Sequence, residues 1–83
     1  MADQIAEILR RNFEGANVSL ETDALSNRIT GTVQWSGFAG HDFLWRQNRL
    51  FGVLRRELGS QAAVISHIFT YTPIEYEAMM AVA

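Results

Sequence analysis

The sequence contains no cysteine and no lysine, and it has a single proline. Without cysteine there is no disulfide, no thiolate metal ligand and no cysteine nucleophile, so packing must stabilise the fold. A metal site would have to be built from carboxylates and from the two histidines, His41 and His67. All seven basic residues are arginines, whose planar guanidinium groups suit carboxylate and phosphate partners.

Long apolar runs and an excess of basic charge are also missing. No stretch approaches the roughly 20 apolar residues that span a bilayer. The N-terminal segment MADQIAEILRRNF has an acid before its first large apolar residues and no long apolar core, unlike a signal peptide. We therefore expect a cytoplasmic protein without a membrane role. A formal net charge of -2 disfavours non-specific nucleic-acid binding, which needs a positive field.

The 83 residues do contain enough apolar material for one core. Hydrophobic residues make up 48% of the chain and charged residues 19%, which is typical of a folded protein rather than a disordered one. A chain of this length has room for a single hydrophobic core. Residues 1–83 are therefore predicted to form one domain.

Hydrophobic periodicity predicts a helix and then two strands in the first half of the chain. Apolar residues recur at helical spacing over residues 3–14. Residues 18–21 and 29–35 alternate apolar and polar side chains, which indicates strands. A short turn at 23–27 joins them as an antiparallel hairpin with one buried face, and Trp35 is expected in the sheet core.

The second half is predicted to contain two helices, a strand and a last helix. Four consecutive polar residues at 46–49 interrupt an apolar stripe that includes Phe43. We therefore expect a short helix near 41–46 and a longer one near 48–58. The run AAVISHIFTY, residues 62–71, is rich in β-branched and aromatic residues and predicts the third strand. The following TPIE is a capping box with proline at the first helical position, which indicates a last helix.

The predicted order of elements is therefore α-β-β-α-α-β-α. A helical crossover between the second and third strands normally returns parallel and right-handed, so the three-stranded sheet is expected to be mixed. The predicted fold class is α+β, with the helices packed largely on one face of the sheet.

This order, together with several short motifs, resembles the BolA-like family, whose fold is similar to the type II KH fold of nucleic-acid-binding proteins. The resemblance runs from about Ile5 to Tyr76. Its pieces, in chain order, are an opening amphipathic helix ending in Phe13, a strand leading to Asp23, FAG at 38–40 against the family's F-x-G, Phe43 and Leu44, Arg46 at the start of the long helix, and TYTPIEY against the family's closing T-x-x-E-W. Their collinear order carries the resemblance.

The resemblance implies an interaction module rather than an enzyme. BolA-like proteins pair with monothiol glutaredoxins across a shared [2Fe-2S] cluster, and some are described as transcriptional regulators. The family's ligating histidine near the start of the third strand corresponds to Val64, and the loop that usually supplies a second ligand, residues 24–28, contains no His or Cys. The family's R-H-R reads Arg46-Gln47-Asn48. The implied role is glutaredoxin pairing with weak, altered or absent cluster ligation.

The two histidines are the remaining candidate ligands. Because side chains alternate along a strand, His67 is predicted to point to the opposite face from Val64, three residues away. We interpret His67 as a sheet histidine with an ordinary hydrogen bond, with metal ligation as the alternative. We interpret His41, at the start of a predicted helix, as a partial cap, again with ligation as the alternative.

The arginines of the long helical segment are the main candidate site for a partner or a phosphate. They are Arg46, Arg49, Arg55 and Arg56. Helical spacing puts the first, second and fourth of them on a similar side. Such a stripe could bind an acidic protein face, glutathione carboxylates or phosphates, and a solvated helix face is the alternative. Trp45 beside them would strengthen the interface interpretation if it is exposed.

Two other patterns are interpreted as structural. Gly37 and Gly40 match the GxxG motif of KH domains, but their loop has no basic residue and precedes both predicted helices, so we interpret it as a strand-to-helix turn. Glu75 and Glu77 lie on one short helix without an opposing cleft. No set of nucleophile, base and orienting group is visible, and we predict no enzymatic activity.

Two functional hypotheses follow from the sequence. The first is a BolA-like interaction and regulatory module that docks a protein, such as a monothiol glutaredoxin, through the Arg-rich helix and the third strand. The alternative is a KH-like nucleic-acid-binding transcriptional regulator that uses the same arginines. Phosphate binding predicts a steep loss of affinity with salt, and a protein interface predicts a weaker dependence.

Overall fold

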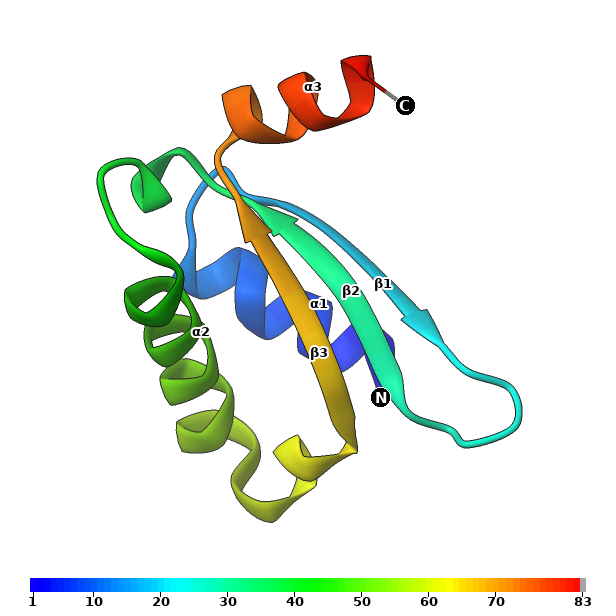
Figure 1. Ribbon diagram of the computed structural model, residues 1–83. Helices are drawn as coiled ribbons and strands as arrows, with labels where there is room; N and C mark the ends of the chain where they lie inside the picture. Colours follow the sequence, from blue (N-terminus) through cyan, green and yellow to red (C-terminus); the bar gives the residue numbers. More distant parts are fainter. Residues whose placement is uncertain (83) are drawn as a thin grey trace.

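The computed structural model describes residues 1–82 as three α-helices, three strands and two short 3₁₀ helices (Figure 1). In chain order these are α1 (Ala2–Asn12), β1 (Asn17–Thr22), β2 (Ile29–Gln34), η1 (Ser36–Phe38), α2 (Phe43–Leu58), η2 (Gly59–Val64), β3 (Ile65–Tyr71) and α3 (Pro73–Ala81). Counting α-helices and strands, the order is α-β-β-α-β-α. The predicted α+β class is confirmed.

The three strands form one mixed sheet in the order β1-β2-β3. β1 pairs antiparallel with β2, and β2 pairs parallel with β3 after the crossover through α2. Asp23 fixes the β1–β2 turn, because its carboxylate accepts hydrogen bonds from the hydroxyl and the backbone N of Ser26 at 2.7 and 2.9 Å. These bonds lower the pKa of Asp23. Asn27 completes the turn with a φ of 61°.

The core lies between the sheet and the two longer helices. α1 and α2 cover one face of the sheet, and α3 lies beyond the end of β3 (Figure 1). The largest fully buried side chains are Phe13, Phe38, Ile5, Leu9, Ile29, Leu50, Leu54, Ile68 and Val33. Within residues 1–82 no helix is both long enough and apolar enough to cross a bilayer.

The prediction of separate helices at 41–46 and 48–58 is wrong, because α2 is one continuous helix. The polar run does not break it, since two of its side chains bond to the edge of β3. Arg46 donates to the backbone oxygen of Thr70 at 3.4 Å, and Gln47 donates to that of Ile68 at 2.9 Å. Polar side chains on the sheet-facing side of a helix are tolerated when they find hydrogen-bond partners of this kind.

Two local expectations also differ from the structure. Phe43 is 68% exposed and does not share the apolar stripe of α2, where Val53 is buried instead. The third strand begins at Ile65 rather than near 62, because the chain first winds through the 3₁₀ turns of η2. Gly59, with a φ of 58°, makes the transition out of α2.

Candidate functional site

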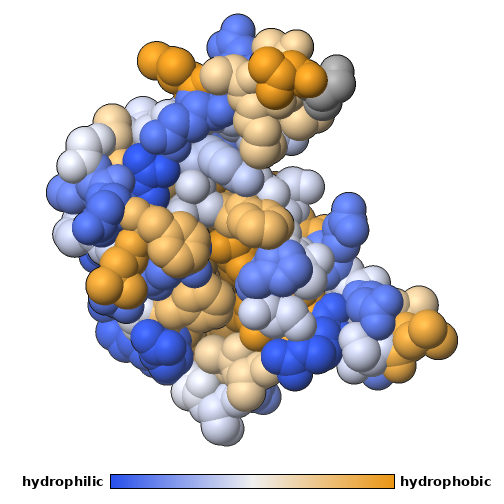
Figure 2. Space-filling view, viewed as in Figure 1, coloured by the Kyte–Doolittle hydropathy of each residue, from blue (hydrophilic) through white to orange (hydrophobic). Residues whose placement is uncertain are grey.

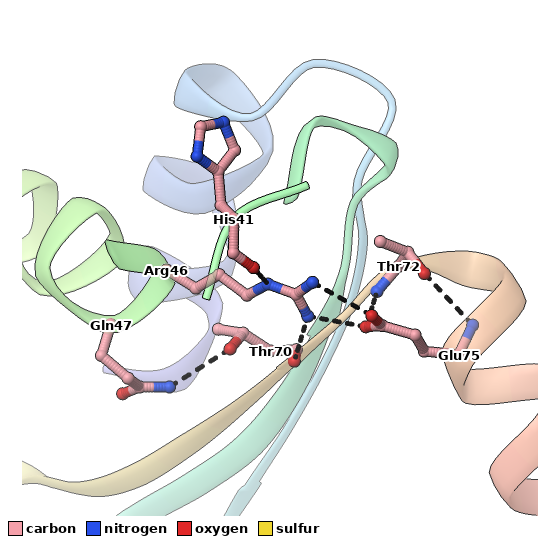
Figure 3. Close-up of polar contacts among 6 residues, drawn as sticks. All are labelled: His41, Arg46, Gln47, Thr70, Thr72 and Glu75. Atoms are coloured by element: carbon pink, nitrogen blue, oxygen red, sulfur yellow. Dashed lines mark hydrogen bonds and ion pairs between the residues drawn. The ribbon is translucent and has the colours of Figure 1, made fainter. Parts of the chain in front are cut away.

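Arg46 joins three elements of the fold (Figure 3). Its guanidinium group forms a two-pronged ion pair with the Glu75 carboxylate at N–O distances of 2.6 and 3.0 Å. It also donates to the backbone oxygens of His41 at 2.8 Å and of Thr70 at 3.4 Å. The side chain is only 11% exposed. Arg46 therefore ties the start of α2 to the end of β3 and to the start of α3.

Glu75 takes part in both this ion pair and the predicted capping box. The backbone N of Glu75 donates to the Thr72 hydroxyl at 3.1 Å, and the Glu75 carboxylate accepts from the Thr72 backbone N at 2.9 Å. The hydrogen bond from Arg46, followed by that from Thr72, lowers the pKa of Glu75 to about 2. The same bond raises the pKa of Arg46. Both charges are engaged within the fold, so Arg46 is not available to an external anion.

The other arginines of α2 lie on two sides of the helix, and all three are exposed. Arg49 lies over the ring of Phe13, the core residue that follows α1, at 5.7 Å from the ring centroid. Arg56 donates a hydrogen bond to the Asn12 side-chain oxygen at 3.3 Å. Arg55 instead lines a hollow of about 410 Å³ beside η2. Arg46 does not share a stripe with Arg49 and Arg56, because its side chain turns inward to Glu75.

An aromatic pair lies at the start of α2. The rings of His41 and Trp45 stack with centroids 3.5 Å apart and planes at 10°. The helix cap is Asp42, whose carboxylate accepts from the Trp45 backbone N at 2.8 Å. The interpretation of His41 as a cap is therefore wrong, since the neighbouring aspartate is the stronger capping residue. Trp45 is 38% exposed and remains a candidate interface residue.

Gly52 lies in the middle of α2 on its exposed side. A Cβ added to it would meet no atom within 4 Å, so no packing inside the described chain requires a glycine. Trp45, Asn48 and Arg55 are exposed at helical spacing from it. We call these four residues the outer face of α2. Sequence reasoning missed Gly52, although an isolated glycine inside a helical pattern is a recognisable signal.

The GxxG segment is a packed turn. Gly37 lies against the indole ring of Trp35, with which a Cβ would collide, and Gly40 turns the chain with a φ of 79°. The indole packs edge-on against Phe13 and Phe38 at centroid distances of 5.0 and 5.1 Å. Packing accounts for the motif, and Trp35 packs against the core as predicted.

His67 lies on the exposed face of β3. The pairing with β2 shifts by one position between Ile65 and His67, which leaves Ser66 as a bulge. Because the bulge interrupts the alternation of side chains, counting residues from Val64 does not determine the face of His67. Val64 itself lies in η2 and packs partly against the core.

Arg28 fixes this bulge and was not singled out from the sequence. Its Nε donates to the Ser66 hydroxyl at 2.6 Å, and its Nη2 donates to the backbone oxygens of Ala63 and Ile65 at 3.0 and 3.3 Å. These partners lie 35 or more positions away along the chain. No local sequence pattern could therefore have indicated them.

The residues present do not fit the ligand set of a [2Fe-2S] cluster that the family resemblance implies. In the part of the chain that the structure describes, no three His, Cys, Asp or Glu side chains lie together as a metal site. Val64 is aliphatic, and His41 is stacked on Trp45. His67 has Phe69 as its aromatic neighbour at a centroid distance of 4.8 Å. Residues 1–82 therefore do not provide the ligands that such a cluster would need from this chain.

Two solved structures are similar to this chain over nearly its whole length. A bolA protein homologue from Coxiella burnetii has a TM-score of 0.72 and 25% sequence identity, covering 93% of this chain and 96% of that chain. A Bol-like protein from Babesia bovis has a TM-score of 0.65 and 19% identity, covering 96% of this chain and 93% of that chain. No family model matches the sequence, and no curated protein matches it. The similarity is thus carried by the arrangement of the elements more than by the sequence.

Proposed function

We propose that this chain, which is BolA-like in its structure, is an interaction and regulatory module that docks a partner protein on the outer face of α2. The class of function is supported by the family resemblance. The location is supported by Gly52. A glycine inside a helix costs about 1 kcal/mol relative to alanine, and within the described chain no packing uses the space it leaves.

The neighbours of Gly52 suit a protein partner. A glycine lets another backbone or side chain approach the helix closely. Trp45 offers partly exposed aromatic area, and Arg55 offers a guanidinium group that pairs well with carboxylates. We infer that the partner presents an acidic group next to a flat apolar surface. A monothiol glutaredoxin is the partner class that the resemblance implies.

We also infer that docking does not depend on a cluster ligand from this chain. The family's ligand position is occupied by Val64, and residues 24–28 supply no His or Cys. His67 lies on β3, outside the outer face of α2. Pairing and cluster ligation are therefore separable here, and they can be measured separately.

Two substitutions at Gly52 test the docking surface. Gly52→Ala should raise the free energy of unfolding by about 0.5–1 kcal/mol, because it removes backbone freedom from the unfolded chain, and it should weaken binding a few-fold, because its Cβ enters the space left for the partner. Gly52→Gln should fold equally well but weaken binding by about tenfold or more, because its side chain occupies the contact. Urea unfolding and titration calorimetry with a monothiol glutaredoxin measure the two effects.

Comparing the three affinities tests where the partner docks. If both Gly52 variants bind as tightly as the unmodified chain, the contact lies elsewhere. No binding by any of the three would remove glutaredoxin as the partner. Anaerobic cluster reconstitution with His67→Ala is the parallel test of ligation: a coloured mixed complex that disappears in this variant would show that His67 is a ligand after all.

The nucleic-acid alternative retains only the exposed arginines as support. With Arg46 paired to Glu75, three guanidinium groups of α2 remain exposed, and they lie on two sides of the helix. Such a surface would give a log affinity that falls with log salt at a slope of about -3 at most. Fluorescence anisotropy with short DNA at two salt concentrations tests it. A slope of about -3 would favour the nucleic-acid hypothesis over protein docking, and a slope near zero or no binding would count against it.

A further inference from the structure

The face of the sheet opposite α1 and α2 carries three rows of side chains. The strand register aligns Glu21 with Thr30 and His67, Ser19 with Thr32 and Phe69, and Asn17 with Gln34 and Tyr71. We call these nine residues the open face. Glu21 is its one acidic residue, and it carries no arginine. An almost uncharged face can accept a mostly apolar helix from a second copy without strong electrostatic repulsion.

Aromatic side chains run along the open face and continue onto α3. The ring centroids of His67 and Phe69 are 4.8 Å apart, and those of Phe69 and Tyr71 are 6.4 Å apart. Tyr71 then meets Tyr76 of α3 edge-on at 5.8 Å. The open face and the near side of α3 therefore form one continuous surface.

Apart from Glu75 and Glu77, α3 is mostly apolar, and yet it buries no residue. Ile74 is 80% exposed and Met80 is 53% exposed, and Met79 and Val82 are exposed as well. The helix is held through its first turn, by the Arg46–Glu75 pair and the capping box. Figure 2 shows α3 projecting over a hollow in the outline of the molecule, with apolar side chains on α3 and on the surface below it. A helix that exposes this many apolar side chains normally packs against another surface.

We propose that this surface binds a second copy of the chain, with α3 of each copy lying across the open face of the other. Taking about 200 Å², the middle of the range for an aromatic side chain, as an upper value for each, the exposed parts of Phe69, Ile74, Met79, Met80 and Val82 provide at most about 600 Å² of apolar area. The polar rows of the open face add to this. A standard interface buries about 800 Å² on each partner, so a reciprocal contact reaches that size and a one-sided contact does not.

Sedimentation velocity of the full chain from about 1 µM to about 1 mM tests the proposal, since an interface of this size allows micromolar affinity. The chain should pass from monomer to dimer within this range. Met80→Glu and Phe69→Glu should each weaken dimerisation about tenfold or more, because a carboxylate is forced into the apolar contact. Leu25→Glu is the matched control: Leu25 is 96% exposed in the β1–β2 turn, outside the proposed contact, and its variant should dimerise like the unmodified chain.

Mixing the two variants tests the reciprocal geometry. In a mixed dimer of Phe69→Glu and Met80→Glu, one of the two α3 contacts joins unmodified residues. The other contact carries both carboxylates. Because a second substitution in a contact that is already broken should cost less than the first, the mixed pair should associate more tightly than either variant with itself. Circular dichroism checks that each variant folds. Met80→Glu is expected to fold normally, because α3 buries no residue. A chain that stays monomeric throughout, a Leu25→Glu variant that dissociates like Met80→Glu, or no gain on mixing would each overturn the proposal.

Self-association and partner docking use different surfaces. The outer face of α2 includes no residue of the open face or of α3. Gly52→Gln should therefore leave the monomer–dimer equilibrium unchanged, and Met80→Glu should leave partner binding unchanged. Either proposal can fail in these measurements while the other holds.

Discussion

Replacing Arg46 with alanine is expected to lower the free energy of unfolding by about 2–3 kcal/mol, the upper part of the range for hydrogen bonds to charged groups. Its guanidinium group is bonded to the Glu75 carboxylate and to the backbone oxygens of His41 and Thr70. The substitution leaves these acceptors without their donor at a place where the side chain was only 11% exposed. Urea unfolding followed by circular dichroism measures the loss.

The pH dependence gives this prediction a second signature. The pKa of Glu75 is about 2 in the folded chain and near its ordinary 4.5 in the unfolded one, so the ion pair stabilises the fold fully above pH 4.5. That contribution is lost as the pH falls from 4.5 to 2. The shift alone corresponds to about 3 kcal/mol, but Glu75 is 46% exposed, and solvent screening reduces our expectation to about 1 kcal/mol. The difference between the unmodified chain and Arg46→Ala should therefore narrow below pH 4.5.

Two further variants separate the ion pair from its surroundings. Glu75→Gln keeps an acceptor for the capping box but removes the charge. It should therefore lower the free energy of unfolding by about 1 kcal/mol and abolish most of this pH dependence. Arg49→Ala removes an exposed guanidinium over an aromatic ring and should cost only about 0.5 kcal/mol. If Arg46→Ala lowered the free energy of unfolding no more than Arg49→Ala does, the contacts of Arg46 would not contribute to stability. The argument that Arg46 is unavailable to a partner would then be wrong.

The position of α3 links this ion pair to self-association. The helix contacts the rest of the described chain through its first turn, where Arg46 holds Glu75. Losing that pair should let α3 change its angle to the sheet, and the proposed contact with a second copy requires a fixed angle. Arg46→Ala should thus weaken dimerisation even under conditions where the chain stays folded. An arginine that sequence reasoning assigned to partner binding would then act by positioning another surface.

The elements that could be predicted from the sequence are those specified by local patterns. The capping box at Thr72 and Glu75 depends on four adjacent residues, and the hairpin depends on two alternating strands and a short turn. Fold class and the parallel return of the third strand follow from these patterns by general rules of chain topology. Each of them was correct without knowledge of any distant contact.

The errors arose where a distant partner decides the outcome. The polar run in α2 looked like a break, but the carbonyl groups of β3 satisfy Arg46 and Gln47 from more than twenty positions away. The bulge at Ser66, held by Arg28, likewise cannot be read from the alternation of residues in the third strand. A one-residue irregularity reverses the face of every side chain after it, so the orientation of His67 was open until the register was known.

The candidate surfaces were only partly accessible to sequence reasoning. A stripe of arginines was predicted from helical spacing, but spacing does not reveal which charge meets an acid elsewhere in the fold. The exposure of Gly52 and of the apolar residues of α3 depends on what the rest of the chain leaves uncovered. The sequence predicted α3 as a helix but did not indicate whether it is buried. Its lack of burial is visible only when all other elements are in place.

Replacing Gly37 with alanine should lower the free energy of unfolding by about 3 kcal/mol, near the upper end of the range for overpacking a core. The added Cβ would collide with three atoms of the Trp35 indole ring. That ring cannot move aside easily, because Phe13 and Phe38 pack edge-on against it and its Nε1 donates to the backbone oxygen of Glu14 at 3.1 Å. Guanidinium unfolding of the variant gives the measurement.

Gly40→Ala is the matched change at the other end of the same loop. Comparing it with Gly37→Ala tests why the GxxG segment has its two glycines. Gly40 has open space around it and a φ of 79°, so alanine there should cost only about 1 kcal/mol of backbone strain. A loop kept for packing predicts this unequal pair of costs, with neither variant changing the affinity for DNA. A loop that also contacts phosphate predicts a loss of DNA affinity in both variants. The stability costs therefore test the packing of Trp35, and the DNA affinities decide whether the loop also acts as a KH-type loop.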